Sequence, residues 1–253
     1  MASPKLLLLL ATLLPSCGLL VADFAPMTLT VVNNCAYPIW PGIQGSAGSE
    51  VLEGGGFFLP SLSHRSFPAP AHAWSGRVWA RTGCAPSAAG AGQLRCATGD
   101  CGGRLQCGGL GGAAPATLAQ VSLHHGGDDQ SSYGVSVVDG FNVGLSVTPH
   151  EGRGNCPVLA CRKDLTQTCP GELQVPGGGG GGGVAACKSG CLAFGTDELC
   201  CRGAYNSPAA CRPSRYSDFF KSECPQAFTY AHDSPSLTHQ CSAPRELKVI
   251  FCH

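Results

Sequence analysis

The residues of this 253-residue chain that are best placed to do chemistry are its cysteines. There are seventeen, and sixteen of them lie between Cys35 and Cys252. Thiols can bind zinc or pair as disulfides, and zinc sites usually show CxxC pairs or an HxxxH pair beside the cysteines. Neither arrangement occurs here. An even set of thiols without metal-ligand spacing therefore predicts eight disulfides in an exported protein.

Other familiar catalytic or cofactor motifs are missing from the sequence. The eight histidines show no ligand spacing, and no Ser–His–Asp hydrolase motif is present. Seven consecutive glycines occupy positions 177–183, but the GK[ST] segment of a phosphate-binding loop does not follow them. We expect this run to form a flexible loop tip, and we expect no cofactor and no metal.

The N-terminal segment, residues 1–22, has the composition of a secretory signal peptide. Lys5 supplies the positive charge, Leu6–Leu14 forms a short apolar run, and Ala22 and Ala25 are possible cleavage positions. A membrane anchor is the alternative, but proline and glycine interrupt the run before about 18 apolar residues have accumulated. We therefore expect a secreted protein.

The overall composition narrows the classes of partner. The formal net charge is zero, which provides no basic excess for nucleic acid or for an anionic membrane. Glycine (36) and proline (19) are abundant and charged residues make up only 13%, so turns and short strands are favoured over long helices. The chain is long enough to bury a core without help. The disulfides would add to that core, each contributing about 2–4 kcal/mol.

Short segments rich in β-branched and apolar residues recur along the chain, with turn signals between them. This pattern predicts a mainly β protein built on a β-sandwich. Asp139-Gly140 is the turn expected between two of these segments. The expected strands are Met27–Asn33, Arg77–Thr82, Thr117–Leu123, Val135–Val138, Phe141–Val147 and Leu247–Cys252.

Two regions lack this strand pattern and are rich in cysteine or glycine. We call residues 83–112 the small loop lobe and residues 161–224 the Cys-rich lobe. Within the second, Ser217–Cys224 is expected to be a short helix, because Ser217 can cap it and Asp218 favours its N-terminus. The sandwich core is then expected to comprise residues 23–82, 113–160 and 225–253.

Nine segments have a more specific sequence. They are Val31–Cys35, Tyr37–Gly42, Trp79–Cys84, Cys96–Cys107, Pro115–Ala119, Val138–Asn142, Cys200–Ala204, Cys224–Ala231 and Val249–Cys252. In this order they resemble the thaumatin-like proteins, group five of the plant pathogenesis-related proteins, over essentially the whole mature chain. Leu94 departs from the family signature, which usually has glycine or phenylalanine there. The resemblance implies a β-sandwich with two disulfide-rich loop lobes, present as a monomer in the apoplast.

The resemblance also implies a disulfide connectivity, which spacing alone leaves open. By the order of the cysteines, the implied pairs are Cys35–Cys252, Cys84–Cys96, Cys101–Cys107, Cys156–Cys241, Cys161–Cys224, Cys169–Cys187, Cys191–Cys200 and Cys201–Cys211.

Antifungal members of this family have a cleft between the core and the second lobe. It contains one arginine and four carboxylates and is thought to bind β-1,3-glucan, and some members have weak endoglucanase activity. Carried over motif by motif, these cleft positions correspond to Arg81, Gln120, Gly134, Asp139 and Asp233. Two of the four acids are therefore replaced.

These replacements weaken a catalytic interpretation. Glycoside hydrolysis generally needs two carboxyl groups across the scissile bond. Gln120 can hydrogen-bond a sugar but cannot serve as an acid, and Arg81 beside the remaining acids would favour their ionised form. A structural role is the alternative for each conserved position: Asp139 in a turn, Arg81 joining a strand to a loop, and Asp233 capping a turn.

The sequence therefore predicts a secreted defence protein that binds β-1,3-glucan of the fungal wall, or perturbs hyphal membranes, without efficient catalysis. The alternatives are a weak endo-β-1,3-glucanase, and an enzyme inhibitor or stress or developmental protein with no role in glucan recognition.

Overall fold

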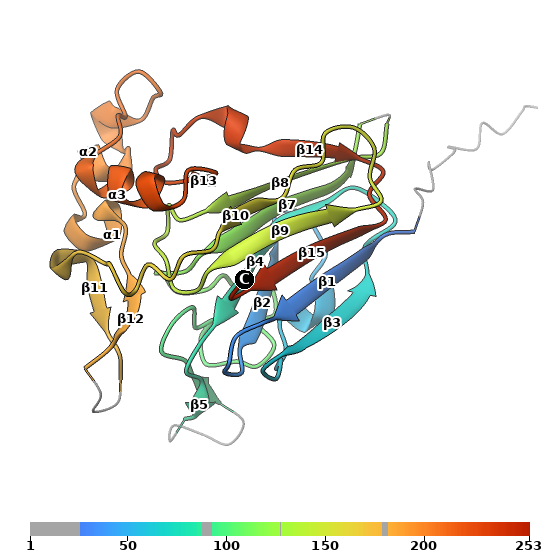
Figure 1. Ribbon diagram of the computed structural model, residues 1–253, viewed down its shortest axis with the longest axis horizontal. Helices are drawn as coiled ribbons and strands as arrows, with labels where there is room; N and C mark the ends of the chain where they lie inside the picture. Colours follow the sequence, from blue (N-terminus) through green and yellow to red (C-terminus); the bar gives the residue numbers. More distant parts are fainter. Residues whose placement is uncertain (1–25, 88–92, 127, 179–181) are drawn as a thin grey trace, which may run out of the picture.

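The computed structural model describes residues 26–87, 93–126, 128–178 and 182–253. The expected signal segment, residues 1–22, and part of the glycine run lie outside these ranges. Two β-sheets pack face to face, and the Cys-rich lobe projects from one end of them, at the left in Figure 1. No helix among the described residues is long and apolar enough to span a membrane.

The two sheets have different strand orders. The five-stranded sheet runs β10-β9-β15-β1-β3, and the six-stranded sheet runs β13-β8-β7-β4-β2 with β14 beside β8. The strands of the first sheet are β1 (Thr28–Asn33), β3 (Ser63–Pro68), β9 (Leu145–His150), β10 (Leu159–Cys161) and β15 (Glu246–Phe251). Those of the second are β2 (Trp40–Gly45), β4 (Trp74–Arg81), β7 (Leu118–His125), β8 (Gln130–Ser136), β13 (Ala227–Phe228) and β14 (His239–Ser242). The predicted sandwich is confirmed.

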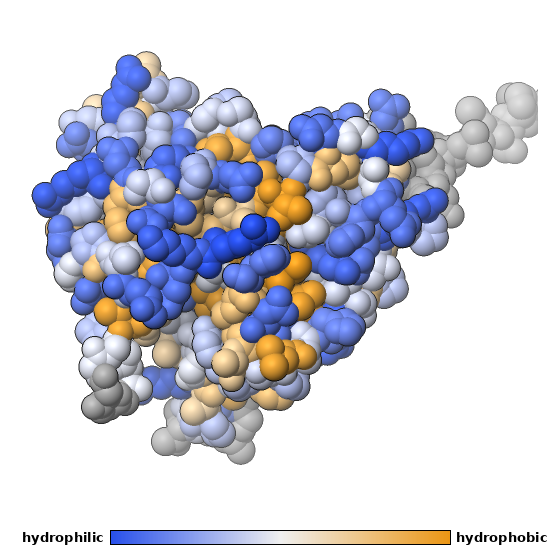
Figure 2. Space-filling view, in the orientation of Figure 1, coloured by the Kyte–Doolittle hydropathy of each residue, from blue (hydrophilic) through white to orange (hydrophobic). Residues whose placement is uncertain are grey.

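The core forms between the inner faces of the two sheets, because side chains alternate along each strand. Leu29 and Val249 come from the first sheet and pack in one buried cluster with Val78 and Val121 from the second. The opposite face of the five-stranded sheet carries interspersed hydrophilic and hydrophobic residues, without one continuous apolar surface (Figure 2).

The lobes contain only short elements. The small loop lobe has β5 (Ala85–Pro86) and β6 (Leu94–Arg95), and the Cys-rich lobe has β11 (Gln174–Pro176), β12 (Val184–Cys187), α1 (Gly190–Phe194), α2 (Asp197–Cys200) and α3 (Arg215–Glu223). Among the described residues, 3₁₀ turns also occur at Gly171–Leu173 and Gly203–Tyr205 in the Cys-rich lobe and at Leu52–Gly55 and Pro235–Leu237 in the core segments. The predicted helix is present, but Ser214 caps it. Ser217 is the third helical residue, and its hydroxyl accepts a hydrogen bond from the backbone of Ser214 in a capping box.

Disulfides close these irregular regions and join the ends of the described chain. β1 and β15 pair in parallel, so that Cys35 and Cys252, which follow them, are bonded to each other. The remaining bonds are Cys84–Cys96, Cys101–Cys107, Cys156–Cys241, Cys161–Cys224, Cys169–Cys187, Cys191–Cys200 and Cys201–Cys211. All eight pairs are those that the family resemblance implies.

The strand–turn–strand unit around Asp139-Gly140 differs from the expectation in one respect. The turn exists, with the Gly140 N–H donating to the Val137 carbonyl at 2.9 Å and Gly140 at a φ of +86° that favours glycine. The strands on either side, however, lie in opposite sheets. The segment therefore crosses from one sheet to the other and is not a hairpin.

The small loop lobe covers part of the outer face of the six-stranded sheet. Trp79 of β4 is fully buried beneath it and donates from Nε1 to the Gly99 carbonyl at 2.8 Å. A Cβ atom at Gly42 or Gly112 would lie 2.3 Å from the indole ring, so both positions need glycine for the ring to fit. Cys101 and Cys107 pack in the same cluster. The lobe is thus attached to the sheet by a second, small hydrophobic core.

The capping box generates a first prediction. Ser214→Ala should lower the free energy of unfolding by about 1 kcal/mol, because an N–H group in the first turn of α3 loses its acceptor. Urea unfolding with the disulfides intact would measure this loss. Ser222→Ala, at an exposed position near the other end of α3, is the matched control and should change stability by less than about 0.5 kcal/mol. Equal effects of the two changes would contradict the assigned cap.

Candidate functional site

The outer face of the six-stranded sheet is open beyond the small loop lobe. Alternation along β4 places Ser75 and Arg77 on this face, while Trp74 and Val78 point into the core. On the neighbouring β7, Gln120 is exposed on the same face and Ser122 is half-buried. Polar side chains therefore gather where no layer formed by the described residues packs against the sheet.

Three hollows that share lining residues form one groove across this face. The first lies between the core and the Cys-rich lobe (about 200 Å³), the second over the middle of the sheet (about 270 Å³), and the third over its far part (about 510 Å³). Asp139 and Tyr230 line both the first and the second hollow. Arg77 and Gln120 line both the second and the third. We refer to the three together as the groove.

Strand register aligns four groove residues in one row across the sheet. Gln44 of β2 pairs with Arg77 of β4, Arg77 pairs with Gln120 of β7, and Gln120 pairs with Gly134 of β8. Neighbouring strands lie about 4.8 Å apart, so this row presents a guanidinium beside an amide, followed by bare backbone at Gly134.

The groove carries almost no net charge. Arg77 is exposed, and its guanidinium makes no hydrogen bond or ion pair with any residue that the structure describes. Asp139 is half-buried in the turn after β8, and its carboxylate likewise has no partner within the described ranges. Among the described residues that line the groove, Asp139 is the one carboxylate. Both charged groups are thus available to a ligand.

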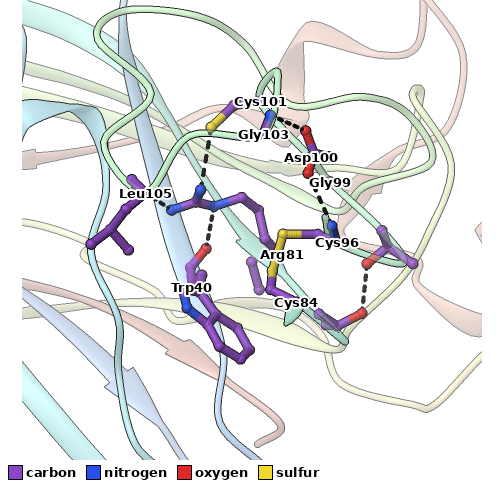
Figure 3. Close-up of a disulfide and its surroundings, with 12 residues drawn as sticks. Trp40, Arg81, Cys84, Cys96, Gly99, Asp100, Cys101, Gly103 and Leu105 are labelled. Atoms are coloured by element: carbon purple, nitrogen blue, oxygen red, sulfur yellow. Dashed lines mark hydrogen bonds between the residues drawn. A yellow bond between two sulfur atoms is a disulfide. The ribbon is translucent and has the colours of Figure 1, made fainter. Parts of the chain in front are cut away.

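Arg81, predicted to belong to the cleft, is not among the residues that line the groove. Its side chain is fully buried under the small loop lobe, where Nε donates to the Trp40 carbonyl at 2.8 Å (Figure 3). The two terminal nitrogens donate to the carbonyls of Pro41, Arg104 and Leu105. Burial lowers the pKa of Arg81 to about 10, although the charge of Asp100 acts to raise it. Arg81 therefore joins strand to loop, the structural alternative.

Asp233 also serves the fold. One carboxylate oxygen accepts from the Thr229 N–H at 2.9 Å and from Lys221 Nζ at 2.7 Å, and the other accepts from the Ser234 N–H at 2.8 Å. The carboxylate caps the turn between β13 and β14, and Asp233 is not among the residues that line the groove. These bonds correspond to the structural alternative for Asp233, the capping of a turn.

The groove brings together three of the five predicted positions, namely Gln120, Gly134 and Asp139. The basic residue beside them is Arg77, which the motif comparison missed. Alternation could have identified it, because Arg77 and Arg81 are four residues apart on one strand and so share a face. Among the described residues, no cluster of three or more histidine, cysteine or acidic side chains is placed to hold a metal.

Comparison with known proteins agrees with this architecture. The model of the thaumatin family matches residues 33–253. The chain belongs to the thaumatin family. An osmotin-like protein of Solanum lycopersicum is 62% identical over 252 residues, covering 100% of this chain and 99% of that protein.

Two further relatives of this thaumatin-family chain carry more specific names. The pathogenesis-related thaumatin-like protein 3.5 of Cryptomeria japonica is 45% identical, covering 88% of each chain. A glucan endo-1,3-beta-glucosidase of Prunus avium is 41% identical, covering 89% of this chain and 90% of that protein.

The two arginines of β4 provide a second prediction. Arg81→Leu leaves buried carbonyl groups without donors and should lower the free energy of unfolding by about 3 kcal/mol or more. Arg77→Leu, the matched control on the same strand and face, should change it by less than about 0.5 kcal/mol. Chemical denaturation followed by tryptophan fluorescence would compare the two. Similar losses would contradict the assignment of Arg81 as the structural residue and Arg77 as the open one.

Asp233 provides a third prediction, on pH. Burial acts to raise the pKa of Asp233, but hydrogen bonds from Lys221, Thr229 and Ser234 together hold it below its ordinary value. The resulting stabilisation is present above the unfolded-state pKa of about 3.9 and is lost as the pH falls through the folded-state pKa. Asp233→Asn should therefore destabilise the protein at neutral pH, and the deficit should shrink under acid conditions.

Thermal unfolding between neutral and strongly acidic pH would measure this deficit. The control is Asp128→Asn, at an exposed acid outside the turn, which should change stability by less than about 0.5 kcal/mol at neutral pH. A deficit for Asp233→Asn that is the same at every pH would contradict an ionised, hydrogen-bonded carboxylate.

Proposed function

We propose that this thaumatin-family protein is a secreted plant defence protein that binds β-1,3-glucan of the fungal wall in the groove without cleaving it. Support for the defence role comes from the family and from a relative named as pathogenesis-related. The choice of β-1,3-glucan as the ligand rests on the chemistry of the groove. Its lining combines polar and apolar groups and is nearly uncharged, and its guanidinium and central amide are free of partners among the described residues.

A neutral glucan matches this lining in hydrogen bonding. Each sugar hydroxyl both donates and accepts, the Gln120 amide does the same, and the guanidinium of Arg77 donates. Phe228 and Tyr230 border the middle hollow and offer ring surface to the apolar C–H faces of a pyranose. Binding sites for small ligands commonly combine such apolar walls with a few polar groups that fix orientation.

The number of carboxylates in the groove favours binding of the glucan over its hydrolysis. Enzymes that cleave glycosidic bonds generally place one carboxyl group as acid and a second as base or nucleophile. Within the described part of the groove, Asp139 has no second carboxyl group opposite it, because Gln120 and Gly134 occupy the other positions and Asp233 is bonded to Lys221. A weak endo-β-1,3-glucanase is the second candidate, and the glucosidase name of one relative favours it.

A fourth prediction tests binding. The purified protein should be retained on insoluble β-1,3-glucan, and Arg77→Ala combined with Gln120→Ala should reduce retention about tenfold, since two hydrogen-bonding groups are lost. Arg95→Ala, at an exposed arginine of the small loop lobe outside the groove, is the control and should bind as the parent does. Failure of the folded parent to bind would refute the proposal.

The same preparation distinguishes binding from catalysis. We expect no release of reducing sugar from soluble β-1,3-glucan between mildly acidic and neutral pH. Release by the parent that is abolished in Asp139→Asn would instead establish the glucanase alternative.

A further inference from the structure

The largest hollow of the groove contains a second polar row, next to the one that includes Gln120. Ser75 of β4 pairs with Ser122 of β7, and Ser122 pairs with Ser132 of β8. These serines lie two residues along each strand from Arg77, Gln120 and Gly134, which corresponds to about 7 Å. The outer face thus presents a row of hydroxyl groups parallel to the first row.

The hydroxyl row is open to a ligand. Ser75 and Ser122 are half-buried, and neither hydroxyl has a hydrogen-bond partner among the residues that the structure describes. Ser132 is bonded to His125 at 3.1 Å, which leaves its hydroxyl further capacity. Ser46 and Thr238 border the hollow at its two sides. The hydroxyls therefore lie at the floor of a space of about 510 Å³.

Gly134 keeps the passage between the two rows clear. It lies in the first row beside Gln120, and a Cβ atom there would already be 3.1 Å from the Phe228 ring, which borders the middle hollow. A longer side chain at this position would have to project over the sheet. Without one, a ligand held at Arg77 and Gln120 can continue over the backbone of β8 and β7 toward the serines.

We propose that the hydroxyl row is a second binding segment of the groove, which holds the continuation of the same neutral polysaccharide chain. This proposal rests on the proposed function, and it adds that affinity depends on chain length. The alternative occupants fit less well: Arg77 is the one described charge in this hollow, too few for a polyanion, and the serines offer no apolar anchor for a protein partner.

Calorimetric titration with a β-1,3-linked disaccharide and hexasaccharide tests the proposal, which predicts tighter binding of the hexasaccharide by the parent protein. Ser122→Leu, which fills the row with an apolar side chain, should weaken hexasaccharide binding about tenfold, the equivalent of two lost hydrogen bonds, and leave disaccharide binding unchanged. The conservative pair Ser75→Ala with Ser122→Ala removes two hydroxyl groups, so it should also weaken hexasaccharide binding about tenfold and leave disaccharide binding unchanged.

Thr148→Leu is the matched control. This half-buried threonine of β9 lies in the other sheet, so the substitution should leave both affinities unchanged. If the parent binds both saccharides equally and Ser122→Leu has no effect, the second segment is refuted while glucan binding stands. If the folded parent binds neither saccharide, both proposals fall.

Discussion

Partial covering of one sheet face by the small loop lobe is the constraint on which the groove depends. Alternation along β4 sends Ser75, Arg77, Trp79 and Arg81 to the same outer face. Trp79 and Arg81 are fully buried there, whereas Arg77 is exposed and Ser75 half-buried. One strand therefore supplies both the attachment of the lobe and the floor of the groove. The edge of the small loop lobe determines where this attachment ends and the floor of the groove begins.

A guanidinium is suited to attaching the small loop lobe to the sheet, because an irregular loop lacks hydrogen-bond donors for its buried carbonyl groups. Buried carbonyl groups need donors, and a loop without a strand ladder cannot supply them from its own backbone. The planar guanidinium of Arg81 offers five donors in fixed directions and reaches carbonyls of both β2 and the lobe. With a pKa of about 10 it keeps its charge at neutral pH despite burial. The disulfide Cys101–Cys107 closes the loop that carries two of these carbonyls, so the edge of the groove is held by covalent and polar contacts together.

Local pattern predicted β1, β4, β7, β15 and most of α3, overlapped β8 and β9 only in part, and missed most of the other strands and both α1 and α2. The order of the cysteines, set beside a known family, predicted every described bridge. Local sequence pattern could not predict the contacts between distant segments of the chain. Arg77 and Arg81 look equivalent in the sequence. In the structure, residues 99–112 fold over Arg81 from another part of the chain and leave Arg77 uncovered. Asp233 resembles a ligand-binding acid until Lys221, twelve positions earlier on α3, is seen to donate to it. The Asp139-Gly140 turn could be predicted from the sequence. That it connects two different sheets depends on which strands pair with β8 and β9.

The small number of carboxylates in the described groove affects which interaction can select a ligand. In a groove lined by several acids, charge dominates and favours cations or a protonated catalytic group. Here the described lining has one guanidinium and one carboxylate among amide, hydroxyl and apolar groups, so hydrogen-bond matching can select a ligand. Such groups are costly to bury unless each finds a partner, so a ligand must present donors and acceptors at close intervals along its length. A neutral polysaccharide does so at every residue. Because Gln120 and Gly134 bring no second carboxyl group into the described lining, this surface supports the proposed retention of an uncut chain over its hydrolysis.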